Sequence, residues 1–213
     1  GNVGLGSGAF GTGLTTGTDN VAIGEAAGDA LTSGSDNTFV GDNAGGATTT
    51  GDFNTAIGAN ALDANSTADS NTAVGMNSLS SNTTGASNTG IGVNALFTNT
   101  TATQNTAVGE QALYLNNGNN NTAVGYDALR ANSTGAGGVA VGHNALDANT
   151  TGSENTAIGS SSLLVNTTGT QNVGVGSSTI DANTTGSYNV AVGTSALGAN
   201  TTASNNTAVG HAA

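Results

Sequence analysis

A pattern of about seventeen residues repeats along the whole chain. Each copy reads Asn-Thr/Val-Ala/Gly-Val/Ile-Gly, two variable residues, Ala-Leu, two variable residues and Asn-Thr-Thr-Gly. The glycine that ends the first segment recurs at spacings of 18, then 17 five times, then 16, then 17 five times. So constant a period predicts a solenoid in which each copy forms one coil. The thirteen anchoring glycines are Gly6, Gly24, Gly41, Gly58, Gly75, Gly92, Gly109, Gly125, Gly142, Gly159, Gly176, Gly193 and Gly210.

The segment that ends at the anchoring glycine predicts a short strand, because its side chains alternate with a period of two and are often β-branched. The residue two before the glycine is Ala or Gly in every copy except Phe39, which predicts that another backbone comes close there. The residue directly before the glycine is always a large aliphatic, and we expect this column to be interior. Its members are Leu5, Ile23, Val40, Ile57, Val74, Ile91, Val108, Val124, Val141, Ile158, Val175, Val192 and Val209.

A second aliphatic column follows the anchoring glycine by four residues. We expect it to be interior as well, on a second, shorter strand of each coil. The Asn-Thr-Thr-Gly segment that comes next is typical of a turn that closes the coil, since Asn and Gly tolerate positive φ. The second column comprises Leu62, Leu79, Leu96, Leu113, Leu129, Leu146, Leu163, Ile180 and Leu197.

Two columns of asparagine complete the repeat. One opens the strand in every copy except at Gly138. Stacked amides can donate to one neighbouring copy and accept from the other, so both columns predict hydrogen-bonded ladders. The second column comprises Asn65, Asn82, Asn99, Asn116, Asn132, Asn149, Asn166, Asn183 and Asn200.

The fold class that follows is all-β, a parallel β-solenoid of about thirteen 17-residue coils forming a single domain over residues 1–213 with no internal linker. Helices are not expected, because the unit lacks helix propensity and an i, i+3, i+4 apolar stripe. At a strand spacing of about 4.8 Å, thirteen coils make a rod on the order of 60 Å long. Each coil buries little apolar area, so we expect three chains, or at least two, to pack side by side.

Composition narrows the range of partners. The formal net charge is −12, Arg130 is the only basic side chain apart from two histidines, and there is no cysteine. This charge disfavours nucleic acid and anionic membrane surfaces. No apolar run approaches the ~18 residues that a membrane span needs, so we expect no membrane insertion in this segment.

The strand segments Asn54 to Gly58, Asn71 to Gly75 and Asn189 to Gly193 resemble the motif of YadA-like head repeats, which occur in trimeric autotransporter adhesins and, in similar form, in phage tail fibres. The resemblance covers almost the whole chain. It implies a left-handed β-roll, three chains per fibre and exposure on a cell or virion surface. The unit here is longer than is typical of that family, and the family's neck, coiled-coil stalk and membrane anchor are absent from the sequence.

No catalytic, cofactor-binding or metal-binding residue is predicted, and we do not expect an enzyme. Gly6 to Gly11 matches Gly-x-Gly-x-x-Gly, but a strand, a helix and an acidic residue do not surround it as a dinucleotide site requires. His143 and His211 each follow an anchoring glycine, in a variable slot that should face solvent. Stacked carboxylates could hold calcium, although a solvated acidic edge explains them more simply. These acids are Asp19, Asp36, Asp52 and Asp69.

Eight turns also match the N-glycosylation pattern, although turn chemistry alone accounts for these residues. They begin at Asn65, Asn82, Asn99, Asn132, Asn149, Asn166, Asn183 and Asn200.

The function expected from the repeat is structural: an extracellular, cell-surface or virion-surface fibre or adhesin module that presents a polar Thr, Asn and Ser surface. Self-association is the expected partnership, as a homotrimer or by head-to-tail stacking into a filament, because both ends of the sequence lie inside the pattern. A host glycan or protein is a further possible partner. The alternative is an ice-binding or glycan-binding β-solenoid. Threonine pairs such as Thr83/Thr84, Thr150/Thr151 and Thr167/Thr168 could form an array, but they fall in the expected turn, which disfavours a flat ice-binding plane.

Overall fold

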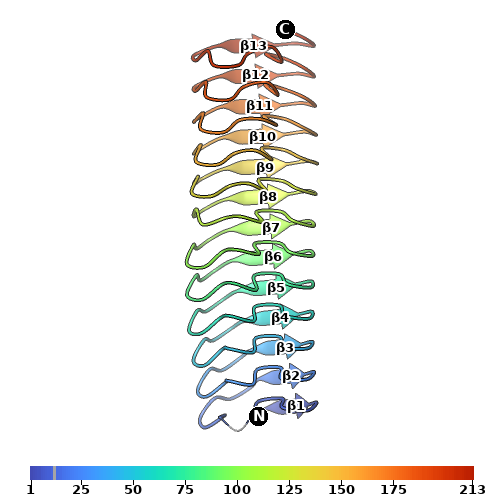
Figure 1. The fold of residues 1–213 in the computed structure, drawn as a ribbon, viewed down its shortest axis with the longest axis vertical. Coiled ribbons are helices and arrows are strands. Elements are labelled where there is room, and N and C mark those ends of the chain that lie inside the picture. Colours follow the sequence, from blue (N-terminus) through green and yellow to red (C-terminus); the bar gives the residue numbers. More distant parts are fainter. Residues whose placement is uncertain (12) are drawn as a thin grey trace. The chain divides into compact units, whose positions relative to one another are not determined.

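A computed structural model describes residues 1–11 and 13–213, which form two compact units, Gly1–Asn105 and Thr106–Ala213 (Figure 1). All regular structure in these residues is β-strand, with one three-residue strand in each coil. The first unit contains β1 (Val3–Leu5), β2 (Val21–Ile23), β3 (Thr38–Val40), β4 (Thr55–Ile57), β5 (Thr72–Val74) and β6 (Thr89–Ile91). The second contains β7 (Thr106–Val108), β8 (Thr122–Val124), β9 (Val139–Val141), β10 (Thr156–Ile158), β11 (Val173–Val175), β12 (Val190–Val192) and β13 (Thr207–Val209).

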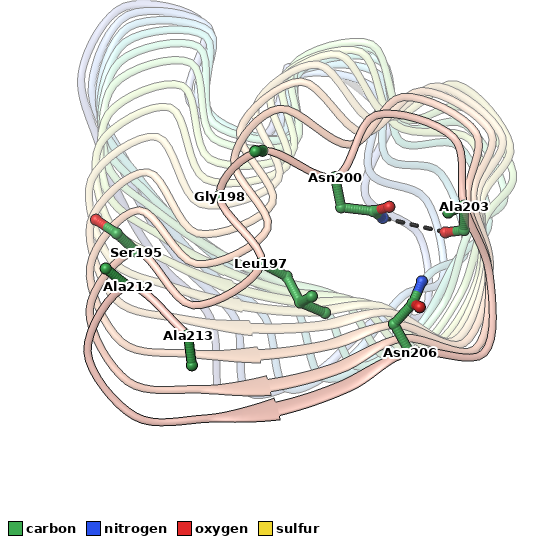
Figure 2. A pocket seen from close by; sticks show the side chains of 9 residues that line it. Ser195, Leu197, Gly198, Asn200, Ala203, Asn206, Ala212 and Ala213 are labelled. Atoms are coloured by element: carbon green, nitrogen blue, oxygen red, sulfur yellow. Dashed lines mark hydrogen bonds between the residues drawn. The ribbon is translucent and has the colours of Figure 1, made fainter.

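Within each unit every strand pairs in parallel with the strands of the adjacent coils, in a register of one repeat. Thr55 lies beside Thr72 and Ala56 beside Ala73 in the first unit, and the second unit pairs in the same way. The predicted parallel β-solenoid is therefore confirmed. Seen from the C-terminal end, the last coil runs clockwise from Leu197 through Asn200 to Asn206 as the chain approaches the viewer, so the second unit is left-handed (Figure 2).

The strand side chains point in the directions opposite to those expected from the sequence. Their middle residues, such as Ala56 and Ala140, are fully buried, whereas the aliphatic that precedes the anchoring glycine is exposed to between a third and a half in most coils, with Ile57 at 40%. The interior assignment of the column from Leu5 to Val209 is therefore wrong. The coil is too narrow for two large residues to face each other, so the small residue points inward and the period of two places the large one outside.

The second aliphatic column is interior, as predicted, but it does not lie on a strand. Leu62, Leu96 and Leu146 are fully buried within turns, with φ near +54°. A left-handed backbone costs an L-residue roughly 1–2 kcal/mol. The turn tolerates this cost because it aims each leucine across the coil at the small residue in the middle of the strand.

The anchoring glycines are explained by close stacking of the coils. Gly75 has φ +127°, and a Cβ atom built on it would lie 2.6 Å from the carbonyl oxygen of Gly92 in the next coil. Gly142 has φ +134° and meets the backbone of Gly159 at 2.7 Å. Only glycine satisfies both the backbone conformation and this contact.

Phe39 is the one large residue in the column of small strand residues, and two glycines make space for it. Gly28 and Gly45 occupy the positions that hold leucine in later coils, and a Cβ atom on either would lie within 2.9 Å of the Phe39 ring. Phe39 is fully buried. The large core residue of this coil therefore lies on the strand rather than in the turn, and the glycines compensate for its volume.

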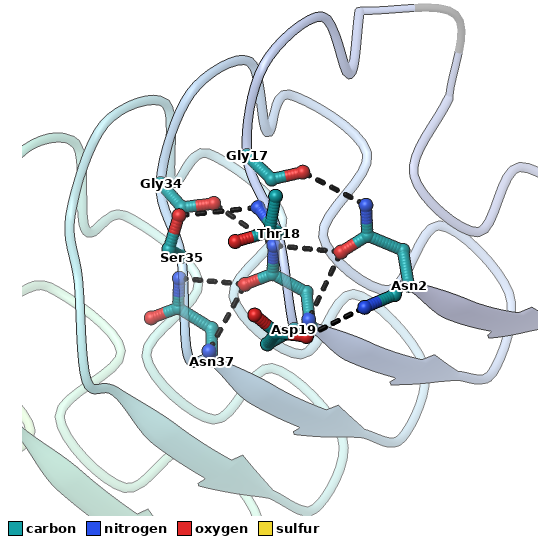
Figure 3. A network of polar contacts seen from close by, with 9 residues as sticks. Asn2, Gly17, Thr18, Asp19, Gly34, Ser35 and Asn37 are labelled. Atoms are coloured by element: carbon teal, nitrogen blue, oxygen red, sulfur yellow. Dashed lines mark hydrogen bonds and ion pairs between the residues drawn. The ribbon is translucent and has the colours of Figure 1, made fainter.

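Both asparagine columns form the predicted ladders, and Figure 3 shows the first coils of the column that opens the strand. In the column that opens the strand, the Oδ1 atom of Asn20 accepts the backbone N–H of Asn37 at 2.9 Å, and its Nδ2 donates to the carbonyl of Gly34 at 2.9 Å. In the turn column, Nδ2 of Asn166 donates to Oδ1 of Asn149 at 2.9 Å. These bonds satisfy buried polar groups that the small apolar core cannot cover.

The ladder of strand-opening amides is interrupted at Gly138. Its N–H still donates to Oδ1 of Asn121 at 2.8 Å, but glycine offers no side-chain oxygen to the coil above. The backbone N–H of Asn155, which would use that oxygen, has no hydrogen bond to any residue that the structure describes.

Candidate functional site: the outer face of the strands

The most regular surface of each unit is the outer face of its strands. We call it the strand face and define it as the first and third residues of every strand. Each of these residues is β-branched except Leu5. Because β-branched side chains have few χ1 rotamers, the strand face is stiff. Neighbouring strands in a sheet lie about 4.8 Å apart, so its side chains form two straight columns in each unit.

One column of the strand face is aliphatic and the other mixes threonine with valine. Ile57, Ile91 and Ile158 keep 40%, 39% and 41% of their surface exposed in the aliphatic column. The first residues of the strands are half-buried in most coils. The threonines of the mixed column are Thr38, Thr55, Thr72 and Thr89 in the first unit and Thr106, Thr122, Thr156 and Thr207 in the second.

The strand face carries no charged side chain, although the chain as a whole has a net charge of −12. The acids lie in the turns, as at Asp42, Asp52 and Asp147. In the first unit the apolar surface widens past the anchoring glycines, where Met76 is 49% exposed and Val93 is also exposed. The strand face is therefore suited to an uncharged or apolar surface.

The turn threonines have a different role. The hydroxyl of Thr83 donates to the carbonyl of Thr100 at 3.0 Å, and that of Thr150 donates to the carbonyl of Thr167 at 3.0 Å. These hydroxyls join one turn to the next. The second threonine of each pair, such as Thr84 or Thr151, is exposed on the turn. The strands carry a further outward threonine column, half-buried in most coils, which the sequence reasoning missed. The signal was available, because a period of two places this threonine on the side opposite the buried asparagine and alanine.

A second group of polar side chains lies in the second unit. The rings of Tyr126 and His143 stack, with centroids 5.5 Å apart and planes 13° apart, and both residues are exposed. Nε of Arg130 donates to Asp147 at 2.8 Å and lies 3.8 Å from Asp127. The hydrogen bond that Arg130 donates to Asp147 raises the pKa of Arg130. Burial raises the pKa of Asp127, against the opposing charge of Arg130.

The remaining sequence candidates are not assembled into a site. Gly6 to Gly11 form the bend and turn that follow β1, with no helix after them in the described residues. His211 is exposed, far along the chain from His143. Asp52 and Asp69 belong to a chain of turn contacts, since the backbone N–H of Asp52 donates to the Asp69 carboxylate at 2.8 Å. In the part of the chain that the structure describes, no three His, Cys, Asp or Glu side chains gather as a metal ion would require, and no helix is long and apolar enough to span a bilayer.

A cavity lies at the end of the second unit (Figure 2). It is lined by Leu197, Asn200 and Asn206, whose equivalents in earlier coils are buried beneath the next coil. Its lining is thus the core of the coil seen end on. It has no arrangement of side chains that differs from the repeat.

The fold and the strand face together define a parallel β-solenoid whose sheet presents an uncharged, β-branched outer surface. Comparison with models of protein families, with curated proteins and with solved structures finds no match. The likeness to YadA-like head repeats therefore stays a prediction, which depends on the repeat motif alone.

Proposed function

We propose that the chain is a structural, non-enzymatic module of an extracellular fibre or adhesin, on a cell or virion surface, whose copies pack side by side through the strand face. The observation that supports this is the aliphatic column of the strand face in each unit, which is exposed in most coils, for example at Ile57, Val124 and Val192, and half-buried in the others. Fully burying a Val or Ile side chain contributes roughly 1.5–3 kcal/mol, so covering the exposed two-fifths contributes about 1 kcal/mol per coil.

Charge favours a second copy of the same chain as the occupant of the strand face. Two copies with a net charge of −12 repel each other wherever their acidic turns meet. The strand face carries no charge, so two copies can meet through it without bringing their acidic turns together. Packed in this way, the copies keep their Asn, Thr and Ser turns outward, available to a host glycan or protein. The resemblance to YadA-like repeats favours three chains per assembly.

Light scattering on the purified protein after size-exclusion chromatography tests this proposal. The parent should elute as a dimer or trimer. Changing Ile57, Val74 and Ile91 together to Thr removes apolar surface but keeps β-branched side chains, and it should yield a monomer with an unchanged circular dichroism spectrum. Changing the exposed turn residues Thr67, Thr84 and Thr101 to Ser is the matched control, which should still assemble. A monomeric parent at ~100 μM, or a triple-threonine variant that assembles like the parent, would contradict side-by-side packing.

Ice binding is a second candidate, and one observation favours it. The strands themselves carry an outward threonine column beside the aliphatic one, for example Thr55 beside Ile57. Thermal hysteresis of the parent and of a Thr55→Tyr/Thr72→Tyr variant distinguishes the two functions. A hysteresis that the parent shows and the tyrosine variant loses would favour ice binding, whereas no hysteresis in the parent would leave the structural role.

A further inference from the structure

Seven of the eight turn asparagines that match the N-glycosylation pattern are buried in the folded chain, and the eighth, Asn200 in the last coil, is half-buried. Asn82 and Asn166 are fully buried. Nδ2 of Asn82 donates to Oδ1 of Asn65 at 3.3 Å and to the carbonyl of Gly85 at 2.9 Å, so both of its N–H groups are engaged. Nδ2 is the atom that would carry the sugar. The same pair of bonds recurs at Asn99, Asn132, Asn149, Asn166, Asn183 and Asn200.

Two other stretches match the same pattern and lie in a different place on the coil. They are Asn120-Asn121-Thr122 and Asn205-Asn206-Thr207. Their first residues, Asn120 and Asn205, are exposed, with φ of +61° and +62°. Both directly precede the strand-opening asparagine.

The exposure of Asn120 and Asn205 belongs to their position in the repeat. The equivalent residues in other coils point outward too, among them Gln104, Glu154 and Tyr188, and they share the left-handed backbone. The position takes acidic, aromatic and amide side chains alike, so the coil does not restrict the size or charge of an outward side chain there. The threonine of each stretch belongs to the outward column of the strands, where Thr122 is half-buried and Thr207 exposed.

We propose that Asn120 and Asn205 are the N-glycan acceptor sites of the folded chain and that the eight turn asparagines are not. In the reaction, Nδ2 of the asparagine forms a bond to the anomeric carbon of a nucleotide-activated hexose. The bond from that carbon to the nucleoside diphosphate breaks, the diphosphate leaves with the electron pair, and the amide loses one proton. Glycans are bulky and need a surface asparagine, which these two stretches supply.

The experiment treats the folded protein with a soluble N-glycosyltransferase and UDP-glucose, followed by intact mass measurement and peptide mapping. Synthetic peptides of residues 79–89 and 116–126 serve as positive controls that both sequences are accepted when unfolded. In the folded protein we expect hexose at Asn120 and Asn205, with at most a tenth of that occupancy at Asn82 or Asn166. Equal occupancy of the turn and exposed sites, or no hexose on Asn120 while its peptide is modified, would overturn the proposal.

A variant separates recognition from folding. Thr122→Val removes the hydroxyl that the acceptor pattern requires and keeps a β-branched residue, which the same column already carries at Val139 and Val173. It should abolish modification of Asn120 and leave that of Asn205 and the circular dichroism spectrum unchanged. Continued modification of Asn120 in this variant would contradict its assignment as an N-glycosylation acceptor.

Discussion

Replacing Gly138 by Asn should stabilise the second unit, because it completes the interrupted amide ladder. The new Oδ1 would accept the backbone N–H of Asn155, and the new Nδ2 would lie near Oδ1 of Asn121 and the carbonyl of Gly152, as in the other coils. Gly138 does not have a positive φ, so the backbone already suits asparagine. A Cβ atom there would lie 3.1 Å from Oδ1 of Asn121, which requires a shift of a few tenths of an ångström.

The expected gain in the free energy of unfolding is about 1–2 kcal/mol. Each new buried hydrogen bond contributes about 1 kcal/mol. Removing a glycine from the unfolded chain contributes roughly a further 0.5 kcal/mol, and ordering the new side chain costs up to ~1 kcal/mol. Repeat arrays do not always unfold as one unit, so a local measurement is needed besides the urea midpoint.

Hydrogen exchange of the Asn155 amide provides that local measurement. The exchange should slow by about tenfold or more in Gly138→Asn, because the amide gains an acceptor in a buried position. The matched control is Gly137→Asn, the same change one residue earlier at an exposed position with φ +67° that asparagine tolerates. If Gly138→Asn leaves both the urea midpoint and the Asn155 exchange rate unchanged, the ladder does not stabilise the coil as argued.

Three further changes test the core. Gly75→Ala should destabilise by about 3 kcal/mol or more in urea unfolding, since its Cβ would overlap the backbone of Gly92. A Cβ on Gly137 makes only an ordinary van der Waals contact, 3.5 Å from Cγ of Glu154, so Gly137→Ala should cost about 1 kcal/mol. Phe39→Ala should lower the free energy of unfolding by roughly 3–5 kcal/mol. Adding Gly45→Leu should recover part of this loss, because it restores the pairing of a small strand residue with a leucine in the turn. Additive effects of the two changes in a double-mutant cycle would refute the idea that Phe39 replaces the leucine. Burial raises the pKa of Asp63, so the charged form of this carboxyl lowers the stability of the folded state above the ordinary carboxyl pKa. Asp63→Asn should therefore raise the urea midpoint at pH 7, and this gain should shrink as the pH falls through the raised pKa. A gain that does not depend on pH would contradict the role given to burial of the charge.

The repeat determines much of the fold at the level of sequence. The period predicts one coil per copy, the asparagine columns predict ladders, and the leucines from Leu62 onward predict the core; all three are confirmed. These features follow from stacking identical rungs, which needs no knowledge of the cross-section. The left-handed conformation of Leu62 was not predictable from propensity, because tertiary packing overrides it.

The direction of the strand side chains is where the sequence reasoning fails, and the failure identifies the candidate site. A large aliphatic in a strand usually marks the core, but here the core already receives a leucine from the turn, so only alanine or glycine fits opposite it. Gly90 shows how little space remains, since a Cβ there would lie 2.6 Å from Oγ of Ser78. Phe39 supports the same conclusion, because this large residue occupies the strand position only where Gly28 and Gly45 stand in place of leucine.

The packing of the coil explains why the aliphatic column of the strand face is exposed. Each coil has a single strand, and the turns that face it across the core cannot also cover its outer side. The aliphatic column is therefore left exposed by the geometry of the coil, however well the interior is packed. A sequence free to vary could place polar residues there, as it does in the turns, yet all thirteen copies carry Val, Ile or Leu. A soluble surface alone does not require such a column, whereas packing against a second copy of the same chain does. This contrast is the physical basis of the proposed side-by-side assembly, and the Ile57, Val74 and Ile91 triple-threonine variant addresses it directly.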